Sequence, residues 1–234
     1  GVAGRVFHVS TDGDDAAAGS AGKPWRTIAR ACAEARAGDR VVIGAGVYRE
    51  TIRPLRSGTT DAPIVFEAEP GQRVEINGAR ELLPAAVELV GKRNIVIRGF
   101  VFHGQRETGF HHADNGQVLV VDSRGILVED CLFDGRMNYV TSLRIHRSAD
   151  VTARNNIFVS HHDAVVMSDN SGFLDIDHNS FLGPTQLAVY AVRNNRVRIT
   201  NNIINECLYP KKKHQYRVRV LGNHHLEMDH NCYV

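Results

Sequence analysis

The second half of the chain repeats one pattern of apolar and polar positions. Each copy has an apolar residue or alanine at its first and third positions and a large apolar residue at its eighth. The copies are "IVIRGFVF" from Ile95, "ILVEDCLF" from Ile126, "VTARNNIF" from Val151, "LDIDHNSF" from Leu174, "VRITNNII" from Val197 and "LEMDHNCY" from Leu226. Because apolar positions alternate with a period of two, each copy is predicted to begin with a β-strand.

A further strand is predicted before each copy, with inward residues eight and six positions before the copy begins. These residues are Val118 and Val120, Leu143 and Ile145, Val166 and Ser168, Val189 and Ala191, and Val218 and Val220. Only Ser168 is polar. Short strands that recur every 23 to 31 residues predict a parallel solenoid, in which each strand pairs with its counterpart one rung away.

The sixth position of the repeat is asparagine in four copies, at Asn156, Asn179, Asn202 and Asn231. In a solenoid these side chains would stack at a bend, where each amide can bond its neighbours above and below. The asparagines are therefore interpreted as part of the fold and not as catalytic residues.

The stretch "KPWRTIARACAEARAGD" before the repeats predicts an amphipathic helix that begins at Pro24 and stops at Gly38. Its apolar face would comprise Trp25, Ile28, Ala29, Cys32 and Ala33. Such a helix would cover the open end of the solenoid.

Residues 1–234 are predicted to form one domain, with the cap and first rung in 1–50 and the regular rungs in 94–234. The final "NCYV" stops halfway through a rung. Either the chain is cut there or further domains of the same polypeptide follow.

Four cap motifs follow one another: "DGDD" at 12–15, "KPWRTI" at 23–28, "GDRV" at 38–41 and "GVYRE" at 46–50. Together with the asparagine-bearing rungs, they resemble the right-handed parallel β-helix proteins of the pectate lyase-like superfamily. The resemblance implies an all-β fold, a single-stranded right-handed parallel β-helix with an N-terminal capping α-helix. It also implies a secreted, carbohydrate-active protein, in a superfamily that includes polysaccharide lyases, polygalacturonases, epimerases and proteins without known activity.

Lyases of this superfamily typically use a lysine or arginine base with Ca²⁺ held by carboxylates, and its polygalacturonases use three aspartates. Neither pattern is found here, because no lysine lies on the predicted first-strand face between residues 116 and 192 and the acids there are too few. No catalytic residue is therefore carried over from the family. Ca²⁺ remains a cofactor that the resemblance suggests, and no metal ligand is assigned.

The net charge of +2, from 28 basic and 26 acidic residues, gives no general reason to expect nucleic acid or a membrane surface as partner. No apolar run of 18 residues predicts a membrane span. An opening "GVAGRVFHV" without a leader fits a mature chain that is secreted or at the cell surface. Any attraction for an anionic partner, such as an acidic polysaccharide, must then be local.

The outward positions of the two strands differ. Beside the repeat copies, charges of opposite sign alternate from rung to rung, so Asp175 and Asp177 are interpreted as members of a structural ladder. On the first strand the outward residues are Gln117, Leu119 and Val121; Ser142, Arg144 and His146; Val165, Met167 and Asp169; Ala188, Tyr190 and Val192; and Arg217, Arg219 and Leu221. Arg144, Tyr190, Arg217 and Arg219 would line a shallow groove suited to a uronate or sulfated sugar chain, or would merely face solvent.

His146 and Asp169 fall in one column on adjacent rungs, where the carboxylate could hold one imidazole nitrogen and leave the other as a base. The "HHD" loop supplies His162 and Asp163, and the basic run "YPKKKHQYR" supplies Lys213, as substrate contacts. A metal site in that loop would need His111, His112 and Asp114 from two rungs earlier. Cys207 and Cys232, about one rung apart, could form a disulfide or remain two thiols.

The leading functional hypothesis is β-elimination on an acidic polysaccharide. Arg144 or Arg219 would hold the uronate carboxylate, and His146 or Tyr190 would remove the C5 proton. Epimerisation would start in the same way. The competing hypothesis is a non-catalytic solenoid that binds carbohydrate or serves as a structural segment of a larger surface protein.

Overall fold

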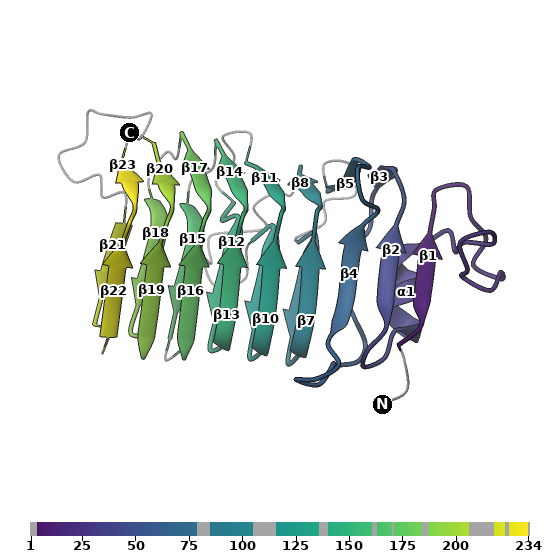
Figure 1. Ribbon diagram of the computed structural model, residues 1–234, viewed down its shortest axis with the longest axis horizontal. Helices are drawn as coiled ribbons and strands as arrows, with labels where there is room; N and C mark the ends of the chain where they lie inside the picture. The colour runs from purple at the N-terminus through teal and green to yellow at the C-terminus, as the bar shows by residue number, and fades with distance from the viewer. Residues whose placement is uncertain are drawn as a thin grey trace.

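The computed structural model describes residues 4–78, 85–104, 116–135, 140–160, 163–169, 171–183, 187–205, 218–222 and 225–233. Within these residues the strands form three parallel sheets along one coiled axis (Figure 1). The expected right-handed parallel β-helix is therefore confirmed. No helix in the described part of the chain is long and apolar enough to cross a membrane.

The nine-stranded sheet holds the first strand of every repeat copy. Its members are β1 (Val6–Val9), β2 (Arg40–Ile43), β4 (Ile64–Ala68), β7 (Arg93–Arg98), β10 (Arg124–Glu129), β13 (Ala149–Arg154), β16 (Phe173–Asp177), β19 (Arg196–Thr200) and β22 (His225–Asp229). Partners lie in the register that the repeat predicts, with Ile126 opposite both Ile95 and Val151.

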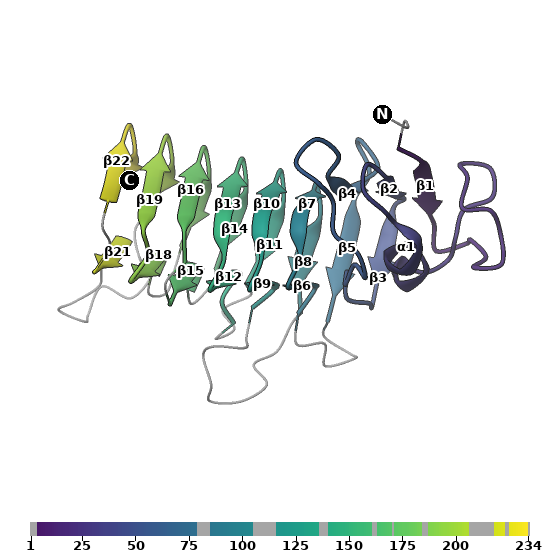
Figure 2. The ribbon, with the colours of Figure 1, turned by 90° about the horizontal axis from the view of Figure 1, so that it is seen from below.

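The eight-stranded sheet follows each of these strands after a short bend. It contains β3 (Gly46–Tyr48), β5 (Val74–Asn77), β8 (Val101–His103), β11 (Leu132–Asp134), β14 (Ile157–Val159), β17 (Ser180–Leu182), β20 (Ile203–Ile204) and β23 (Cys232–Tyr233). The six-stranded sheet contains β6 (Val87–Val90), β9 (Val118–Val121), β12 (Leu143–His146), β15 (Asp163–Ser168), β18 (Leu187–Val192) and β21 (Val218–Leu221). It lies along the lower side of the coil in Figure 2.

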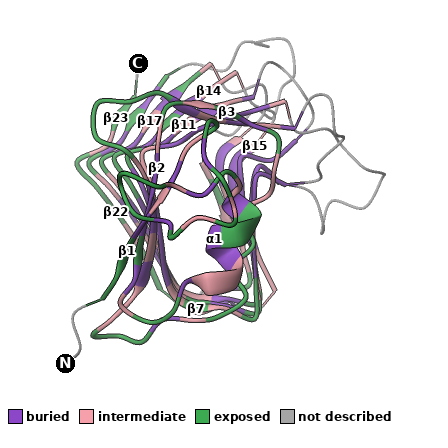
Figure 3. Ribbon diagram, turned by 90° about the vertical axis from the view of Figure 1, so that its right-hand side faces the viewer, coloured by how far each residue is buried: buried purple, intermediate pink, exposed green. Residues whose placement is uncertain are grey.

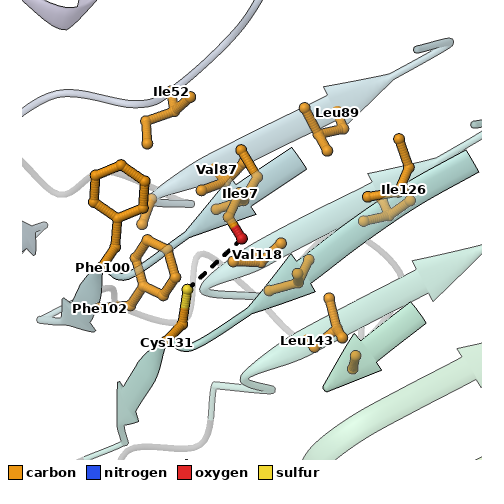
Figure 4. Close-up of a cluster of buried hydrophobic side chains, with 14 of the residues drawn as sticks. Ile52, Val87, Leu89, Ile97, Phe100, Phe102, Val118, Ile126, Cys131 and Leu143 are labelled. Carbon is orange, nitrogen blue, oxygen red and sulfur yellow. Dashed lines mark hydrogen bonds between the residues drawn. The ribbon is translucent and has the colours of Figure 1, made fainter. Parts of the chain in front are cut away.

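Inward side chains from the three sheets fill the coil. The eighth repeat positions stack face to face, with ring centroids 4.6 Å apart between Phe133 and Phe158 and 4.9 Å apart between Phe158 and Phe181. Figure 4 shows Ile97 of the nine-stranded sheet, Phe102 of the eight-stranded sheet and Val118 of the six-stranded sheet among the side chains of this core. Because stacked apolar residues exclude water along the whole axis, this column is the hydrophobic core.

The asparagine ladder is present as predicted. Asn156 donates from its backbone N–H to Asn179 Oδ1 at 2.9 Å, and its own Oδ1 accepts from the N–H of Cys131 at 3.0 Å. Asn179 bonds Asn202 in the same way at 2.8 Å, and Asn202 bonds Asn231 at 3.1 Å. These amides satisfy buried backbone groups where the chain turns from the nine-stranded to the eight-stranded sheet.

The capping helix is shorter than predicted. α1 spans Ile28–Glu34, and Thr27 is its N-cap, since Thr27 Oγ1 accepts from the N–H of Arg30. Trp25 is extended because it forms a β-bridge with Val9, so the helix cannot begin at Pro24. The buried face is Ile28, Ala31 and Cys32, whereas Ala29 is exposed. Viewed along the axis, α1 lies over the open end of the coil, as expected (Figure 3).

The predicted register of β15 was wrong by one residue. Val165 and Met167 lie opposite Leu143 and Ile145 and are fully buried, so Val166 and Ser168 point outward. Met167 precedes Leu174 by seven residues, whereas the corresponding inward residues of the neighbouring rungs are six apart. One extra residue at this bend therefore shifts every side chain of β15 to the other face.

Candidate functional site

Two columns of outward side chains run along the six-stranded sheet. The first column is Glu88, Leu119, Arg144, Val166, Tyr190 and Arg219, and the second is Val90, Val121, His146, Ser168, Val192 and Leu221. Outside β15 the prediction is confirmed: Leu119, Arg144, His146 and Tyr190 occupy outward positions.

The first column is largely withdrawn from solvent at its centre. Arg144 is 9% exposed and lies between Leu119, at 8%, and Val166, at 2%. Gln117 and Ser142, which were also expected to face a groove, are buried as well. The open groove predicted around Arg144 is therefore not seen, and the accessible side chains next to Arg144 lie in the second column.

His146 in the second column lies at the centre of a polar cluster. Its Nδ1 is 3.2 Å from Asp169 Oδ2 and 3.2 Å from Ser168 Oγ, both on the next rung. Arg147 Nη1 contacts the other ring nitrogen, Nε2. The predicted contact between His146 and Asp169 is thus present, although Ser168, and not Asp169, is the residue opposite His146 in the sheet.

Asp169 belongs instead to a column at the bend between the six-stranded and the nine-stranded sheets. The members are Asp122, Arg147, Asp169 and Arg193, and each has a positive φ between 45° and 58°. Their charges alternate, so that Arg147 bonds both carboxylate oxygens of Asp122 at 2.7 Å and Arg193 bonds Asp169 at 2.5 Å. We call these four residues the corner ladder.

The corner ladder lowers the pKa of one of its carboxyl groups. The hydrogen bond from Arg147 holds the pKa of Asp122 below its usual range. A charged acceptor at Asp169 favours a proton on His146 Nδ1, and Nε2 then carries the ring's lone pair. Proton transfer at this site would therefore take place at Nε2.

A row of buried serines fixes the same bend from inside. The hydroxyl oxygens of Ser123 and Ser148 each accept a hydrogen bond from a backbone N–H on the preceding rung. Lys92 N–H bonds Ser123 Oγ at 2.9 Å, and Ser123 N–H bonds Ser148 Oγ at 3.1 Å. The N–H of Ser148 in turn bonds Ser171 Oγ at 3.2 Å. These bonds set the position of His146, which lies two residues before Ser148.

Sequence reasoning missed the corner ladder and the serine row, because it followed the alternation of residues along strands and treated the bends as mere connections. A signal was available: serine stands three residues before the copies that start at 126, 151 and 174, and the charges at 122, 147, 169 and 193 alternate in sign.

The remaining predicted site residues are spread out. Arg219 lies over the ring of Tyr190, 5.6 Å from its centroid, two rungs or more from His146. Asp163 begins β15, five residues before Ser168, which is about 16 Å along an extended strand. His162, Lys213 and Arg217 lie outside the described residues, as do His111, His112 and Asp114.

The geometry narrows the chemistry. Ser168 and Asp169 both contact the same imidazole nitrogen, whereas a serine hydrolase needs its nucleophile and its acid on opposite nitrogens. A glycosidase pair needs one carboxyl group of raised pKa, but Asp122 and Asp169 are each held by an arginine. The cluster fits a histidine base or acid beside guanidinium groups.

Ca²⁺, which the family resemblance suggested, does not fit the described residues. No group of three or more His, Cys, Asp or Glu side chains that could hold a metal is found among them. The carboxylates nearest to His146 already neutralise Arg147 and Arg193. Cys232 carries a free thiol, and Cys207 lies outside the described residues.

Comparison with known families gives two matches. Residues 83–204 match the family described as "Right handed beta helix region", and residues 11–54 match a family described as a protein of unknown function. The first match spans the repeat, and the second spans the cap motifs.

Two curated proteins are similar to parts of the chain. "Uncharacterized protein YwoF" of Bacillus subtilis (strain 168) is 35% identical over 100 residues, which are 41% of this chain and 21% of that protein. "Pectate lyase PEL9" of Emericella nidulans is 40% identical over 74 residues, which are 31% of this chain and 18% of that protein. The matched parts thus span about a fifth of each relative's length.

Two solved structures share the fold over almost the whole chain. An alginate lyase from Paenibacillus sp. str. FPU-7 aligns with a TM-score of 0.75 at 11% identity, covering 98% of this chain and 76% of the other. A rhamnogalacturonan lyase aligns with a TM-score of 0.67 at 15% identity, covering 97% and 62%. At these identities the likeness concerns the fold alone.

Proposed function

Because the chain belongs to the right-handed β-helix family, we propose that it acts on an acidic polysaccharide by β-elimination at His146. The observation that carries this proposal is the arrangement of the imidazole, with Asp169 at Nδ1 and the Arg147 guanidinium at Nε2. A base and a cation side by side are what proton abstraction next to a carboxylate requires. The relatives named pectate, alginate and rhamnogalacturonan lyase support this reaction class.

In this mechanism Nε2 of His146 takes the C5 proton of a uronate unit. The electron pair of the broken C–H bond forms the C4–C5 double bond, the glycosidic oxygen on C4 leaves and takes up a proton from water, and the imidazolium of His146 then returns its proton to solvent. Arg147 moves from Nε2 to the substrate carboxylate and neutralises the charge that develops on it. Asp169 stabilises the imidazolium that forms, as a carboxylate does beside a catalytic histidine.

The other predicted residues have supporting roles in this proposal. Tyr190, with Arg219 stacked on its ring, offers a face for a neighbouring sugar and a cation for its carboxylate. Arg144, which is buried in the first column, adds positive charge between Leu119 and Val166. Because acidic polysaccharides are found outside cells, we expect the protein to work as a secreted or surface-bound form.

A binding protein without turnover is the second candidate. It is favoured by the contact between Arg147 and Nε2, since this guanidinium occupies the lone pair that a base would use. Epimerisation needs the same base and differs only in where the proton returns.

The test is incubation with polygalacturonate, rhamnogalacturonan and alginate while the absorbance of the unsaturated product is followed. His146→Asn should abolish product formation and leave binding within about threefold, because proton abstraction contributes mainly in the transition state. His178→Asn is the matched control, since His178 also pairs with an aspartate, Asp177 at 2.8 Å, but at a different bend. Loss of turnover in both variants, or in neither, would contradict the assignment of His146, and binding by the parent without product would favour the second candidate.

A further inference from the structure

The outer face of the nine-stranded sheet neutralises its charges almost everywhere. Glu67 bonds Arg98 at 3.1 Å and also contacts Arg40, and Glu129 lies between Arg98 at 2.5 Å and Arg154 at 2.7 Å. Each of these arginines therefore has an acidic neighbour one rung away. This alternation is the arrangement that stabilises stacked strands.

At the bend into this sheet the rule is broken. Arg93 and Arg124 lie directly opposite one another in adjacent strands, although like charges in that position repel. Arg124 has Asp150 at 2.7 Å, but no carboxylate lies within ion-pair distance of the Arg93 guanidinium among the residues that the structure describes. Among the same residues, Lys92 Nζ bonds a backbone oxygen, that of Leu55 at 3.0 Å, and no carboxylate, and the Arg56 guanidinium likewise bonds the oxygen of Ala33.

Arg56, Lys92, Arg93 and Arg124 lie together, and we call them the corner cations. The N–H of Arg93 bonds Ser57 Oγ at 3.1 Å, and the N–H of Arg124 bonds the oxygen of Lys92 at 2.9 Å. These bonds connect consecutive rungs, which are about 4.8 Å apart in a parallel sheet. Arg56, Arg93 and Arg124 are exposed and Lys92 is half-buried, so the cationic groups are accessible.

The corner cations continue directly into the candidate site. The serine row that follows Lys92 leads through Ser123 to Ser148, and Arg147 of the corner ladder precedes Ser148. The cationic surface and His146 therefore lie along the same edge of the coil, parallel to its axis. This is the lower edge of the molecule in Figure 3, near the label of β7.

We propose that the corner cations bind the anionic groups of an extended acidic polysaccharide whose reacting unit lies at His146, an inference that rests on the proposed function. Cations on consecutive rungs along the axis suit a chain with one charge on each successive sugar, and an anion between Arg93 and Arg124 relieves their repulsion. A single-stranded nucleic acid is the less suitable polyanion, because its bases stack on aromatic side chains, and no aromatic ring contacts the corner cations among the described residues.

The test measures the affinity of the parent and its variants for oligomers of polygalacturonate and of alginate, at low and high salt. Arg93→Gln should weaken binding about tenfold, the loss of one charge-assisted bond, and should reduce the dependence on salt. The control is Arg49, an exposed arginine beyond β3 for which no ion pair is seen in the described part of the chain. The Arg49→Gln variant should bind like the parent. Because Arg93→Gln also removes a like-charge contact, its Tm should be unchanged or higher, which separates a binding role from a structural one.

Several results would overturn the proposal: no binding of either polyuronate by the parent, unchanged affinity in Arg93→Gln, an equal loss in Arg49→Gln, or equally tight binding of single-stranded DNA. The outcomes also separate this proposal from the proposed function. Weaker binding by Arg93→Gln without any unsaturated product supports the corner cations and contradicts the lyase. Product formation with an unchanged KM in Arg93→Gln supports the lyase and contradicts the corner cations.

Discussion

At the scale of single residues, Asn156 shows how a polar side chain can be essential to a core. Its side-chain N–H groups bond Asn179 Oδ1 and the oxygen of Val128, and its Oδ1 serves Cys131. Asn156→Leu should lower the free energy of unfolding by about 1 to 3 kcal/mol, because buried partners on both neighbouring rungs lose a hydrogen bond. Chemical denaturation of the purified variant measures this change.

The control is the adjacent Asn155, which is exposed and has a φ of 54°. Asn155→Gly keeps a residue that adopts this conformation readily, so its unfolding free energy should stay within about 0.5 kcal/mol of the parent's. Equal effects at the two positions would mean that the ladder adds nothing beyond the preference of the bend for asparagine.

Residue-scale reasoning from sequence reached His146 and Asp169 but not their surroundings. Strand alternation identified which side chains of β12 point outward, and a column argument brought Asp169 close. The sequence could not show that Arg147 contacts Nε2 of His146. Arg147 has a positive φ, so it does not follow the alternating pattern of a strand, and the direction of its side chain depends on the shape of the bend. The sequence also could not predict the burial of Arg144, because the exposure of an outward side chain depends on what covers the sheet and not on the strand itself.

At the scale of elements, the six-stranded sheet shows how a single extra residue limits prediction. The repeat length fixed the facing of β9, β12, β18 and β21, but the extra residue before Ser171 reversed β15. Ser168 was the one polar residue at a predicted inward position, and that anomaly indicated the shift. The register is decided by burial, since only the observed one places Val165 and Met167 in the core.

The charged ladder of the nine-stranded sheet makes stability depend on pH. Burial alone would raise the pKa of Glu129, but hydrogen bonds from Arg154 and Arg98 outweigh it and hold the pKa below the ordinary 4.5. A carboxyl group with a depressed pKa in the folded state stabilises the fold above its unfolded pKa, and this stability is lost as the pH falls through the folded value. Tm should therefore fall on acidification below about pH 4.5.

Glu129→Gln should make that fall less steep, because one of the contributing carboxylates is gone. Thermal melts of both proteins across the acid range provide the measurement. Asp61→Asn alters an exposed carboxylate for which no ion pair is seen within the described ranges, and it should leave the slope of the parent intact. A slope that is the same in all three proteins would remove Glu129 from the acid response.

At the scale of the whole molecule, the architecture was predictable because every rung repeats the same requirement. Inward apolar positions recur at a nearly constant spacing, and a coil that stacks them in parallel is the arrangement that buries all of them together. The candidate site is less predictable, since its residues lie in bends and outward columns that the repeat does not constrain. The cap shows the same limit, because α1 was expected from its apolar spacing while its start was decided by the pairing of Trp25 with Val9.

Stacked rungs also predict that stability varies along the axis, because each rung contacts only its neighbours. Ile199 and Met228 occupy the same inward position in adjacent strands, but Ile199 is fully buried whereas Met228 is 40% exposed. In the polypeptide of residues 1–234, Ile199→Ala should destabilise by about 2 to 5 kcal/mol, and Met228→Ala by less than about 1 kcal/mol, since little apolar surface is buried there. Amide hydrogen exchange should likewise be fastest in β21, β22 and β23 and slowest around the stacked Phe133, Phe158 and Phe181. Uniform protection from β2 to β22 would show that the coil unfolds as one cooperative unit. The two alanine variants would then still differ in stability, but their patterns of hydrogen exchange would be the same.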